Sequence, residues 1–193
     1  MEKTEDRRIR KTKKQIRIGL SKMMMVKDID AITVKELVEA ADINRSTFYL
    51  HYRNVDVLLQ AVEAVVLEDI RAIFKSEDDF IPTQSSSIIR KLFNYFNNNQ
   101  DIIRAFLGPH GSEAYIANVY KAVLEDYRQL IMPHSVNAYS DDFELAFSFC
   151  FNGMLGIIRK WLDQPLPSST MDHFSDVVSK VVIPVLDEFI VRR

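Results

Sequence analysis

The sequence predicts an all-α protein, in which a three-helix N-terminal head with a helix-turn-helix precedes a larger helical body, about nine helices in total. Two observations carry this prediction. First, the 193 residues include only 5 Gly and 6 Pro, which leaves long segments without helix-breaking residues. Second, apolar residues recur at helical spacing along most of the chain, and no segment alternates like a strand bounded by hairpin turns.

The composition indicates a folded chain with a basic front. Apolar residues make up 47% and charged residues 27%, which suffices for a sizeable core. Residues 1–60 hold 13 Lys or Arg against 9 Asp or Glu, while residues 61–193 hold 12 against 18. A basic front suits a protein that presents one end to a polyanion, although a charged N-terminus is also often merely solvated.

The same composition predicts a cytoplasmic protein without a membrane partner. The single cysteine, Cys150, excludes an intramolecular disulfide and fits a reducing compartment. Residues 1–17 lack the apolar core of a signal peptide. No apolar run reaches the ~18 residues of a membrane span.

Helix-start signals divide the front of the chain into short elements. Residues 1–11 have no apolar periodicity, and we expect them to form a flexible arm. A T-x-x-Q capping box at Thr12 then opens a first helix that ends near residues 27–30. Thr33 opens the second helix by the same kind of signal, because Glu36 follows three residues later.

A short third helix at residues 45–51 completes the head, which we assign to residues 12–55. Residues 42–44 read Asp-Ile-Asn and form the connector between the second and third helices. So short a helix is not stable in isolation, so Phe48 and Tyr52 must pack inward to hold it.

Residues 56–193 are expected to form the helical body. Asn54 caps a long, apolar fourth helix. Further helices are expected at about residues 83–97, 101–108, 113–131 and 141–163, followed by a last one that starts at a capping box of Ser169 and Asp172. Pro184 should kink or break that last helix.

Polar side chains crowd the third helix in the pattern of a helix that reads DNA. Such a helix anchors one face on a neighbouring helix and presents hydrogen-bonding groups to the major groove on the other. With Phe48 inward, Arg45 can pair with guanine or with a phosphate. The candidate DNA-binding residues are Lys35, Asn44, Arg45, Ser46, Thr47, Tyr49, His51 and Arg53. An ordinary polar surface would explain any one of them, but it explains the whole set poorly.

This stretch resembles the N-terminal helix-turn-helix of the tetracycline-repressor (TetR) family of bacterial regulators. The family pattern is a Thr-initiated helix, an Ala-Gly-hydrophobic turn and then T-[FL]-Y-x-[HY]-[FV]. This chain has Thr33, then Ala41-Asp42-Ile43, then T-F-Y-L-H-Y at residues 47–52, and the resemblance covers about residues 12–60. It implies a homodimer whose two heads contact successive major grooves of a palindromic operator. It also implies a ligand pocket in the body whose filling releases DNA.

Two positions depart from the family pattern. Asp42 stands in place of the turn glycine, but aspartate tolerates the left-handed conformation, so the turn should survive. Val55 stands where the family usually has a lysine that contacts a phosphate. This departure indicates weaker binding to the DNA backbone, or compensation by Arg53.

The helix expected around residues 143–162 is apolar almost all round, which is typical of a helix buried on two sides. With the last helix it would form half of a four-helix dimer interface, and the alternative is a central helix of a monomeric core. The expected interface residues are Phe149, Gly153, Ile157, Trp161, Phe174, Val178, Val181 and Val185. The expected ligand-pocket residues are Phe96, Phe106, Tyr115, Tyr120, Phe147, Cys150, Phe151 and Met154.

These features predict a ligand-responsive, homodimeric DNA-binding transcriptional regulator, with repression as the favoured mode. Its expected partners are double-stranded DNA, a second copy of the chain and an unknown small-molecule effector. The alternative is a helical dimer that has lost operator binding and acts through a protein partner, which only Val55 favours. An enzyme is not expected, since the sequence has no nucleophile–base pair, phosphate loop or usefully spaced carboxylate pair. The four His and one Cys lack metal-site spacing, so no metal or cofactor is expected.

Overall fold

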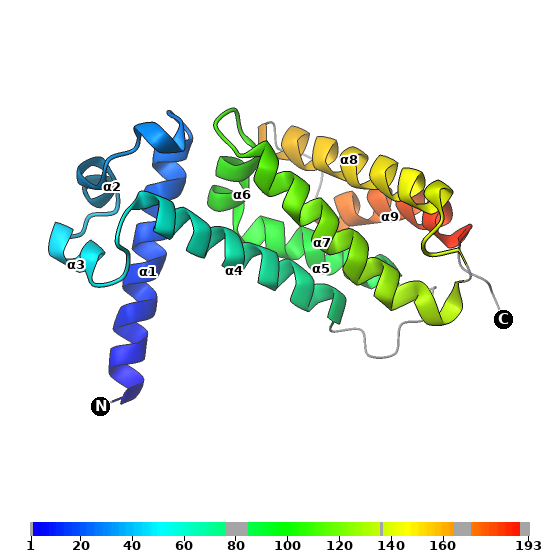
Figure 1. The fold of residues 1–193 in the computed structure, drawn as a ribbon, viewed down its shortest axis with the longest axis horizontal. Helices are drawn as coiled ribbons and strands as arrows, with labels where there is room; N and C mark the ends of the chain where they lie inside the picture. Colours follow the sequence, from blue (N-terminus) through cyan, green and yellow to red (C-terminus); the bar gives the residue numbers. More distant parts are fainter. Residues whose placement is uncertain (1, 76–84, 136, 164–170, 190–193) are drawn as a thin grey trace. The chain divides into compact units, whose positions relative to one another are not determined.

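The computed structural model describes residues 2–75, 85–135, 137–163 and 171–189, and every regular element in these ranges is helical (Figure 1). This confirms the predicted all-α fold, and the count of nine α-helices in the same ranges agrees with the expected number. The helices are α1 (Glu2–Met24), α2 (Val34–Ala40), α3 (Arg45–Tyr49), α4 (Val55–Lys75), α5 (Ser85–Asn98), α6 (Gln100–Leu107), α7 (Glu113–Ile131), α8 (Asp141–Asp163) and α9 (Met171–Asp187). Two short 3-10 turns lie at Ile29–Ala31 and Met132–His134.

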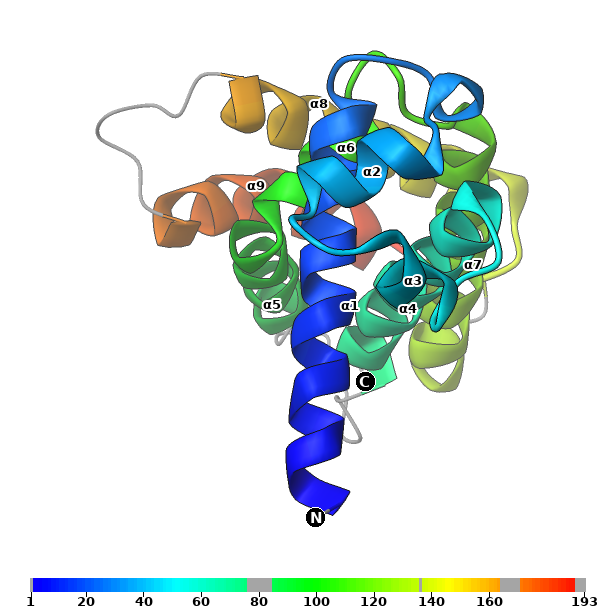
Figure 2. The ribbon, with the colours of Figure 1, turned by 90° about the vertical axis from the view of Figure 1, so that its left-hand side faces the viewer.

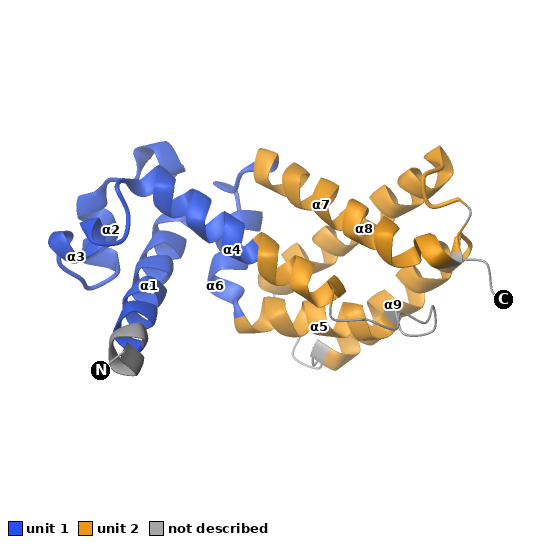
Figure 3. Cartoon of the chain, turned by 60° about the horizontal axis from the view of Figure 1, so that its bottom comes forward, with its two compact units in different colours: residues 1–66, 99–113 blue, residues 67–98, 114–193 orange. Residues whose placement is uncertain are grey.

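The chain divides into two compact units (Figure 3). The first unit contains residues 1–66 and 99–113, and the second contains residues 67–98 and 114–193. The division therefore falls inside α4 and not at residue 55, and α6 groups with the head although the sequence placed it in the body. A sequence boundary drawn at a helix start cannot detect that a later helix returns to pack on the head.

The core of the first unit forms where α1 packs against α2 and α6. Ile16 and Leu20 on α1, Leu37 on α2, Phe48 on α3 and Leu58 on α4 are completely buried. The close approach of α1 and α2 depends on Gly19, because a Cβ atom there would lie 2.8 Å from the Cβ of Ala41.

Helix α1 begins at Glu2, so residues 2–11, which the sequence predicted to be a flexible arm, extend the first helix. The capping box at Thr12 consequently lies inside the helix and does not start it. Glu, Lys and Arg dominate this segment and are all good helix formers. Once the buried half of α1 is anchored, such residues continue the helix without any apolar stripe.

The second unit is built on a tight aromatic core in which α9 packs against both α5 and α8. The ring of Phe174 on α9 stacks on Phe93 and meets Trp161 edge-on, with centroid distances of 6.4 Å and 6.5 Å. Phe143 stacks on Tyr127 in the same way at 6.3 Å. These contacts bring helices α5, α7, α8 and α9 around one core.

Helix α9 continues through Pro184 to Asp187, so the expected break does not occur. Proline removes one backbone hydrogen bond and leaves the carbonyl four residues earlier, at Lys180, without its helical partner. Pro184 and Lys180 are both exposed, so solvent can satisfy that carbonyl. The predicted start of this helix at Ser169 lies outside the described residues. No helix in the described ranges is long and apolar enough to span a membrane.

Candidate nucleic-acid interface and ligand cavity

The start of α2 is held by the predicted capping box. The Thr33 hydroxyl accepts the backbone N–H of Glu36 at 3.3 Å, and the Glu36 carboxylate accepts the backbone N–H of Thr33 at 3.0 Å. The ammonium group of Lys27 also donates to Glu36 at 2.6 Å, which ties the segment after α1 to α2. The bonds from Lys27 and then Thr33 lower the pKa of Glu36 from 4.5 to about 2.

This network should make the stability of the head depend on pH in the acidic range. The pKa of Glu36 is lower in the folded state than in the unfolded state. Its contribution to the free energy of unfolding is therefore complete above about pH 4.5 and is lost as the pH falls towards 2. We expect the difference in urea-unfolding midpoint between the wild type and Glu36→Gln to shrink over this window. Glu39→Gln, at an exposed position on the same helix, is the matched control. If the difference in unfolding midpoint stays constant from pH 7 to pH 2.5, the ionised Glu36 carboxylate does not stabilise the head.

The turn between α2 and α3 has the conformation expected from the sequence. Asp42 has a φ of 53°, in the left-handed region that aspartate tolerates. The backbone N–H of Ile43 then donates to the carbonyl of Val38 at 3.0 Å and closes the turn. Asn44 occupies the N-cap of α3 without a side-chain capping bond. Its exposed amide therefore does not serve to start the helix.

Helix α3 is anchored by one face and open on the other. Phe48 is completely buried and meets the rings of Tyr49 and Tyr52 at centroid distances of 5.5 Å and 5.9 Å. Figure 2 views the first unit from the side on which α2 and α3 lie. Of the predicted DNA-binding residues, those that are exposed are Lys35, Asn44, Arg45, Ser46, Tyr49 and Arg53. The other two, Thr47 and His51, are half-buried.

Arg45 and Tyr49 form a pair on the open face of α3. The guanidinium of Arg45 donates to the Tyr49 hydroxyl at 3.1 Å and lies 5.6 Å from the centroid of its ring. Residues four apart on a helix are neighbours, so the pair follows from the sequence spacing. The contact restricts the rotamers of Arg45 and directs an uncompensated positive charge along the outer face of α3.

Val55 has an apolar role at the start of α4. Its side chain is 7% exposed, and Asn54 caps the helix by accepting the backbone N–H of Val57 at 2.9 Å. Valine at this position therefore contributes to the packing of the head. Arg53, two residues earlier, is exposed, so the compensation considered from the sequence stays a prediction.

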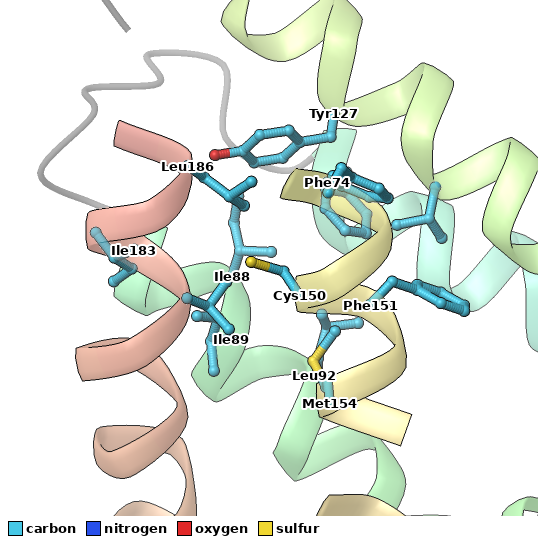
Figure 4. Close-up of a pocket in the computed structure, with 13 residues that line it drawn as sticks. Phe74, Ile88, Ile89, Leu92, Tyr127, Cys150, Phe151, Met154, Ile183 and Leu186 are labelled. Carbon is cyan, nitrogen blue, oxygen red and sulfur yellow. The ribbon is translucent and has the colours of Figure 1, made fainter. Parts of the chain in front are cut away.

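The second unit contains a cavity of about 50 Å³ between α5, α7, α8, α9 and the end of α4 (Figure 4). Its lining residues are Phe74, Ile88, Ile89, Leu92, Val123, Tyr127, Phe147, Cys150, Phe151, Met154, Val182, Ile183 and Leu186. The sequence prediction included Phe147, Cys150, Phe151 and Met154, which all lie on α8. The prediction favoured aromatic residues and included none of the aliphatic side chains that α5 and α9 contribute, nor Phe74 and Tyr127.

The other four predicted pocket residues do not line this cavity. Phe96 packs on Phe93 at a centroid distance of 6.2 Å. Tyr120 is half-buried and packs edge-on against Phe151 at 5.2 Å. Tyr115 is buried elsewhere, and Phe106 belongs to the first unit. Which buried side chains face this cavity depends on the packing of several helices, and the sequence does not contain that information.

The lining of the cavity is almost entirely apolar. The only polar atoms among the lining side chains are the Tyr127 hydroxyl and the Cys150 thiol. Burial raises the pKa of the Cys150 thiol, so it remains protonated at neutral pH. A protonated, buried thiol behaves as a small apolar group. The cavity therefore suits a hydrocarbon and not a charged molecule.

Helices α8 and α9 expose two apolar stripes, which we call the α8–α9 stripes. The α8 stripe contains Leu145, Phe149 and Gly153, and the α9 stripe contains Val177 and Val181. Phe149 is 68% exposed, and a Cβ atom added to Gly153 would meet nothing within 4 Å. Large exposed apolar side chains in such a repeat are typical of a surface that another molecule covers.

Two of the predicted interface residues lie inside the chain. Trp161 and Val178 are 5% and 1% exposed, so they offer almost no surface to a second copy. Phe174 is likewise engaged within the chain by Phe93 and Trp161. Ile157 and Val185 are half-buried at the edges of the stripes. The apolar residues around α8 did not indicate which face packs inside the chain, and the structure shows that the face with Leu145 and Phe149 remains exposed.

In the described part of the chain, no three His, Cys, Asp or Glu side chains come together in a group that could hold a metal ion. A capped helix-turn-helix with an exposed polar third helix, joined to a helical unit with an apolar cavity, defines a transcriptional regulator with a DNA-binding part and a ligand-binding part.

Comparison with known families agrees with this class. The family model described as bacterial regulatory proteins of the tetR family matches residues 21–62. A second model, described as a transcriptional regulator C-terminal region and named for the same family, matches residues 83–184, which is more than half of the chain. The chain belongs to the TetR family of bacterial regulatory proteins. No curated protein matches the sequence.

Several solved structures share the fold. A TetR transcriptional regulator from Streptococcus agalactiae has a TM-score of 0.60 and 20% identity, with 96% of this chain and 99% of that chain covered. The fatty acid degradation regulator FadR from Bacillus halodurans has a TM-score of 0.69 and 14% identity, with coverages of 89% and 94%. FadR from Bacillus subtilis, solved in complex with stearoyl-CoA, has a TM-score of 0.66 and 14% identity, with coverages of 88% and 96%. At these identities the likeness establishes the fold alone.

Proposed function

We propose that the protein is a homodimeric repressor that binds a palindromic DNA operator through α3 and responds to an apolar small molecule in the cavity of the second unit. One observation carries the DNA-binding part of this proposal. Helix α3 is fastened by the buried Phe48, while Arg45, Ser46 and Tyr49 on the same short helix are exposed. This arrangement fits the major groove of DNA. Such a regulator acts in the bacterial cytoplasm, where the chromosome lies.

The exposed residues divide into those suited to bases and those suited to phosphates. Arg45, oriented by Tyr49, has the planar fork that matches the O6 and N7 atoms of guanine. Lys35 on α2 precedes α3 in the chain, and Arg53 follows it. Both are exposed cations that can bind phosphates of the DNA backbone. Repression follows if the bound dimer covers a promoter.

Arg45→Ala should weaken binding to duplexes that the wild-type protein selects from a random pool. The loss of one bidentate base contact should cost about 1–3 kcal/mol for each head. Fluorescence anisotropy between 50 and 200 mM salt would measure the affinity and its salt dependence. Arg53→Ala is the matched control, because loss of a phosphate contact should weaken all sequences equally and reduce the salt slope by about 1 per head. Failure to select any duplex would refute the proposed function.

The cavity indicates the chemical class of the effector. Its lining offers no charged group, so the buried part of the effector should be a hydrocarbon chain or ring. The present volume of about 50 Å³ is well below the ~300–1,000 Å³ of ordinary ligand pockets, so binding must separate α5, α8 or α9. The complex of Bacillus subtilis FadR with stearoyl-CoA supports a long acyl chain as one ligand of this kind.

Cys150→Val should stabilise the protein and weaken its response to such ligands. Valine replaces the thiol with methyl groups and fills part of the cavity, which should raise the free energy of unfolding by about 0.5–1 kcal/mol. Thermal melts with and without a series of long-chain acyl-CoA molecules would measure both effects. Cys150→Ala is the matched control, since it enlarges the cavity and should lower the melting temperature while keeping the ligand-induced shift. Equal ligand-induced shifts in Cys150→Val and the wild type would exclude this cavity as the effector site.

A further inference from the structure

Leu50, which lies between Tyr49 and His51 at the end of α3, is the most exposed large apolar side chain in the described part of the chain, at 81%. An isolated exposed leucine needs no explanation on an ordinary surface. This one is surrounded by the residues suited to contact DNA, so its direction decides whether it can take part.

The backbone of Leu50 continues the geometry of α3. Its φ and ψ are −69° and −21°, and its N–H donates to the carbonyl of Ser46 at 3.2 Å. At 3.6 residues per turn, Ser46 and Leu50 each lie two residues from Phe48 and therefore point about 160° away from it. Phe48 is completely buried, so Ser46 and Leu50 occupy the part of the helix farthest from the core of the head. Arg45 and Tyr49 form the neighbouring row.

We propose that Leu50 packs against the C5 methyl group of a thymine in the operator and makes the protein selective for thymine at that position. This inference rests on the proposed DNA-binding function. In the major groove the thymine methyl is the one apolar group on a base edge, and the other edges present donors and acceptors. A leucine held against a donor or acceptor would strip it of water without replacing its hydrogen bond, which is costly. Leucine also has no charge with which to bind a phosphate.

Ser46 can add a hydrogen bond to a base edge next to the proposed Leu50 contact. Its side chain is exposed one helical turn before Leu50, on the same row. A hydroxyl can either donate to or accept from a base edge, so Ser46 tolerates several bases. Leu50 is therefore the more selective member of the pair.

The test replaces thymine with deoxyuridine, which removes only the C5 methyl group. Duplexes are first selected from a random pool with the wild-type protein, and each thymine of the selected site is then replaced by deoxyuridine in turn. We expect an effect at one position of the site, which occurs once in each half-site. Replacing that thymine in one half-site should weaken binding of the wild type about fourfold, and replacing it in both half-sites should weaken binding about fifteenfold. These values correspond to the loss of about one buried methyl group per half-site. Leu50→Ala should bind the thymine and deoxyuridine duplexes equally.

Val26→Ala is the matched control, because Val26 is also an exposed apolar residue of the first unit, at 68%, but lies outside the helix-turn-helix. It should retain the full preference for thymine. Thermal melts would verify that Leu50→Ala is folded, as expected for so exposed a side chain. If the wild type discriminates at no position, or if Leu50→Ala keeps the preference, the inference is overturned and Leu50 is left to contact a protein partner. If the pool yields no sequence at all, the DNA-binding proposal fails, and this inference fails with it.

Discussion

Gly153→Leu should dissociate the homodimer that we propose. A Cβ atom at Gly153 meets nothing within 4 Å in the single chain, so leucine adds no clash there and improves helix propensity by about 0.8 kcal/mol. If the α8 stripe packs closely on a second copy, the added side chain must be accommodated in both subunits. Overpacking of this kind should weaken the dimer by about 3 kcal/mol, or roughly 100-fold in the dissociation constant.

Sedimentation equilibrium over a range of protein concentrations would measure the change in dimerisation. DNA binding should weaken with it, because a single head contacts only one half-site. Lys121→Leu, which places the same side chain on the exposed surface of α7, is the matched control and should leave the dimer intact. A dissociation constant that Gly153→Leu leaves unchanged would move the dimer interface away from the α8–α9 stripes.

Phe48→Ala should unfold the head and abolish DNA binding. Phe48 is completely buried and is the only buried residue of α3, so its removal leaves a large void beneath a five-residue helix. The loss of a buried phenylalanine costs about 3–5 kcal/mol. The short helix has no other anchor of this size, and it cannot persist alone in water. Hydrogen exchange should show lost protection in α2 and α3.

Tyr49→Ala provides the matched control for this prediction. It removes an aromatic ring from the next residue, but Tyr49 is exposed and its main partner is Arg45. We expect it to cost at most ~1 kcal/mol in stability, as is usual away from buried positions. Both variants should bind DNA more weakly. Only Phe48→Ala should lose protection from hydrogen exchange in α2 and α3. Equal protection in the two variants would show that α3 is held by something other than Phe48.

Features that depend on a few neighbouring residues could be predicted from the sequence. The capping box of Thr33 and Glu36 forms as expected, because its two partners are always three residues apart in a helix. Asp42 adopts the left-handed turn for an equally local reason. Phe48 is buried because it faces the neighbouring helices, while the polar residues around it remain exposed.

Features that depend on the packing of distant helices could not be predicted in this way. The residues that face the cavity from α5 and α9 read as ordinary aliphatic core, and only the packing of the helices places them at a void. Trp161 and Val178 read equally well as core or as interface in the sequence, and in the structure both are buried within one chain. Leu50 is apolar and could have belonged to the core, yet it is 81% exposed on the outermost row of α3.

Sequence patterns therefore sufficed to predict the all-α class, the helix-turn-helix with its capped second helix and buried Phe48, and the polar character of α3. Each of these follows from interactions within one or two turns of helix, whose geometry is the same in any protein. The tertiary structure alone decided the lining of the cavity, the exposed stripes of α8 and α9, and the burial of Val55. An apolar side chain is equally suited to a core, a cavity wall or an interface, and only the helices packed around it determine which of these it becomes.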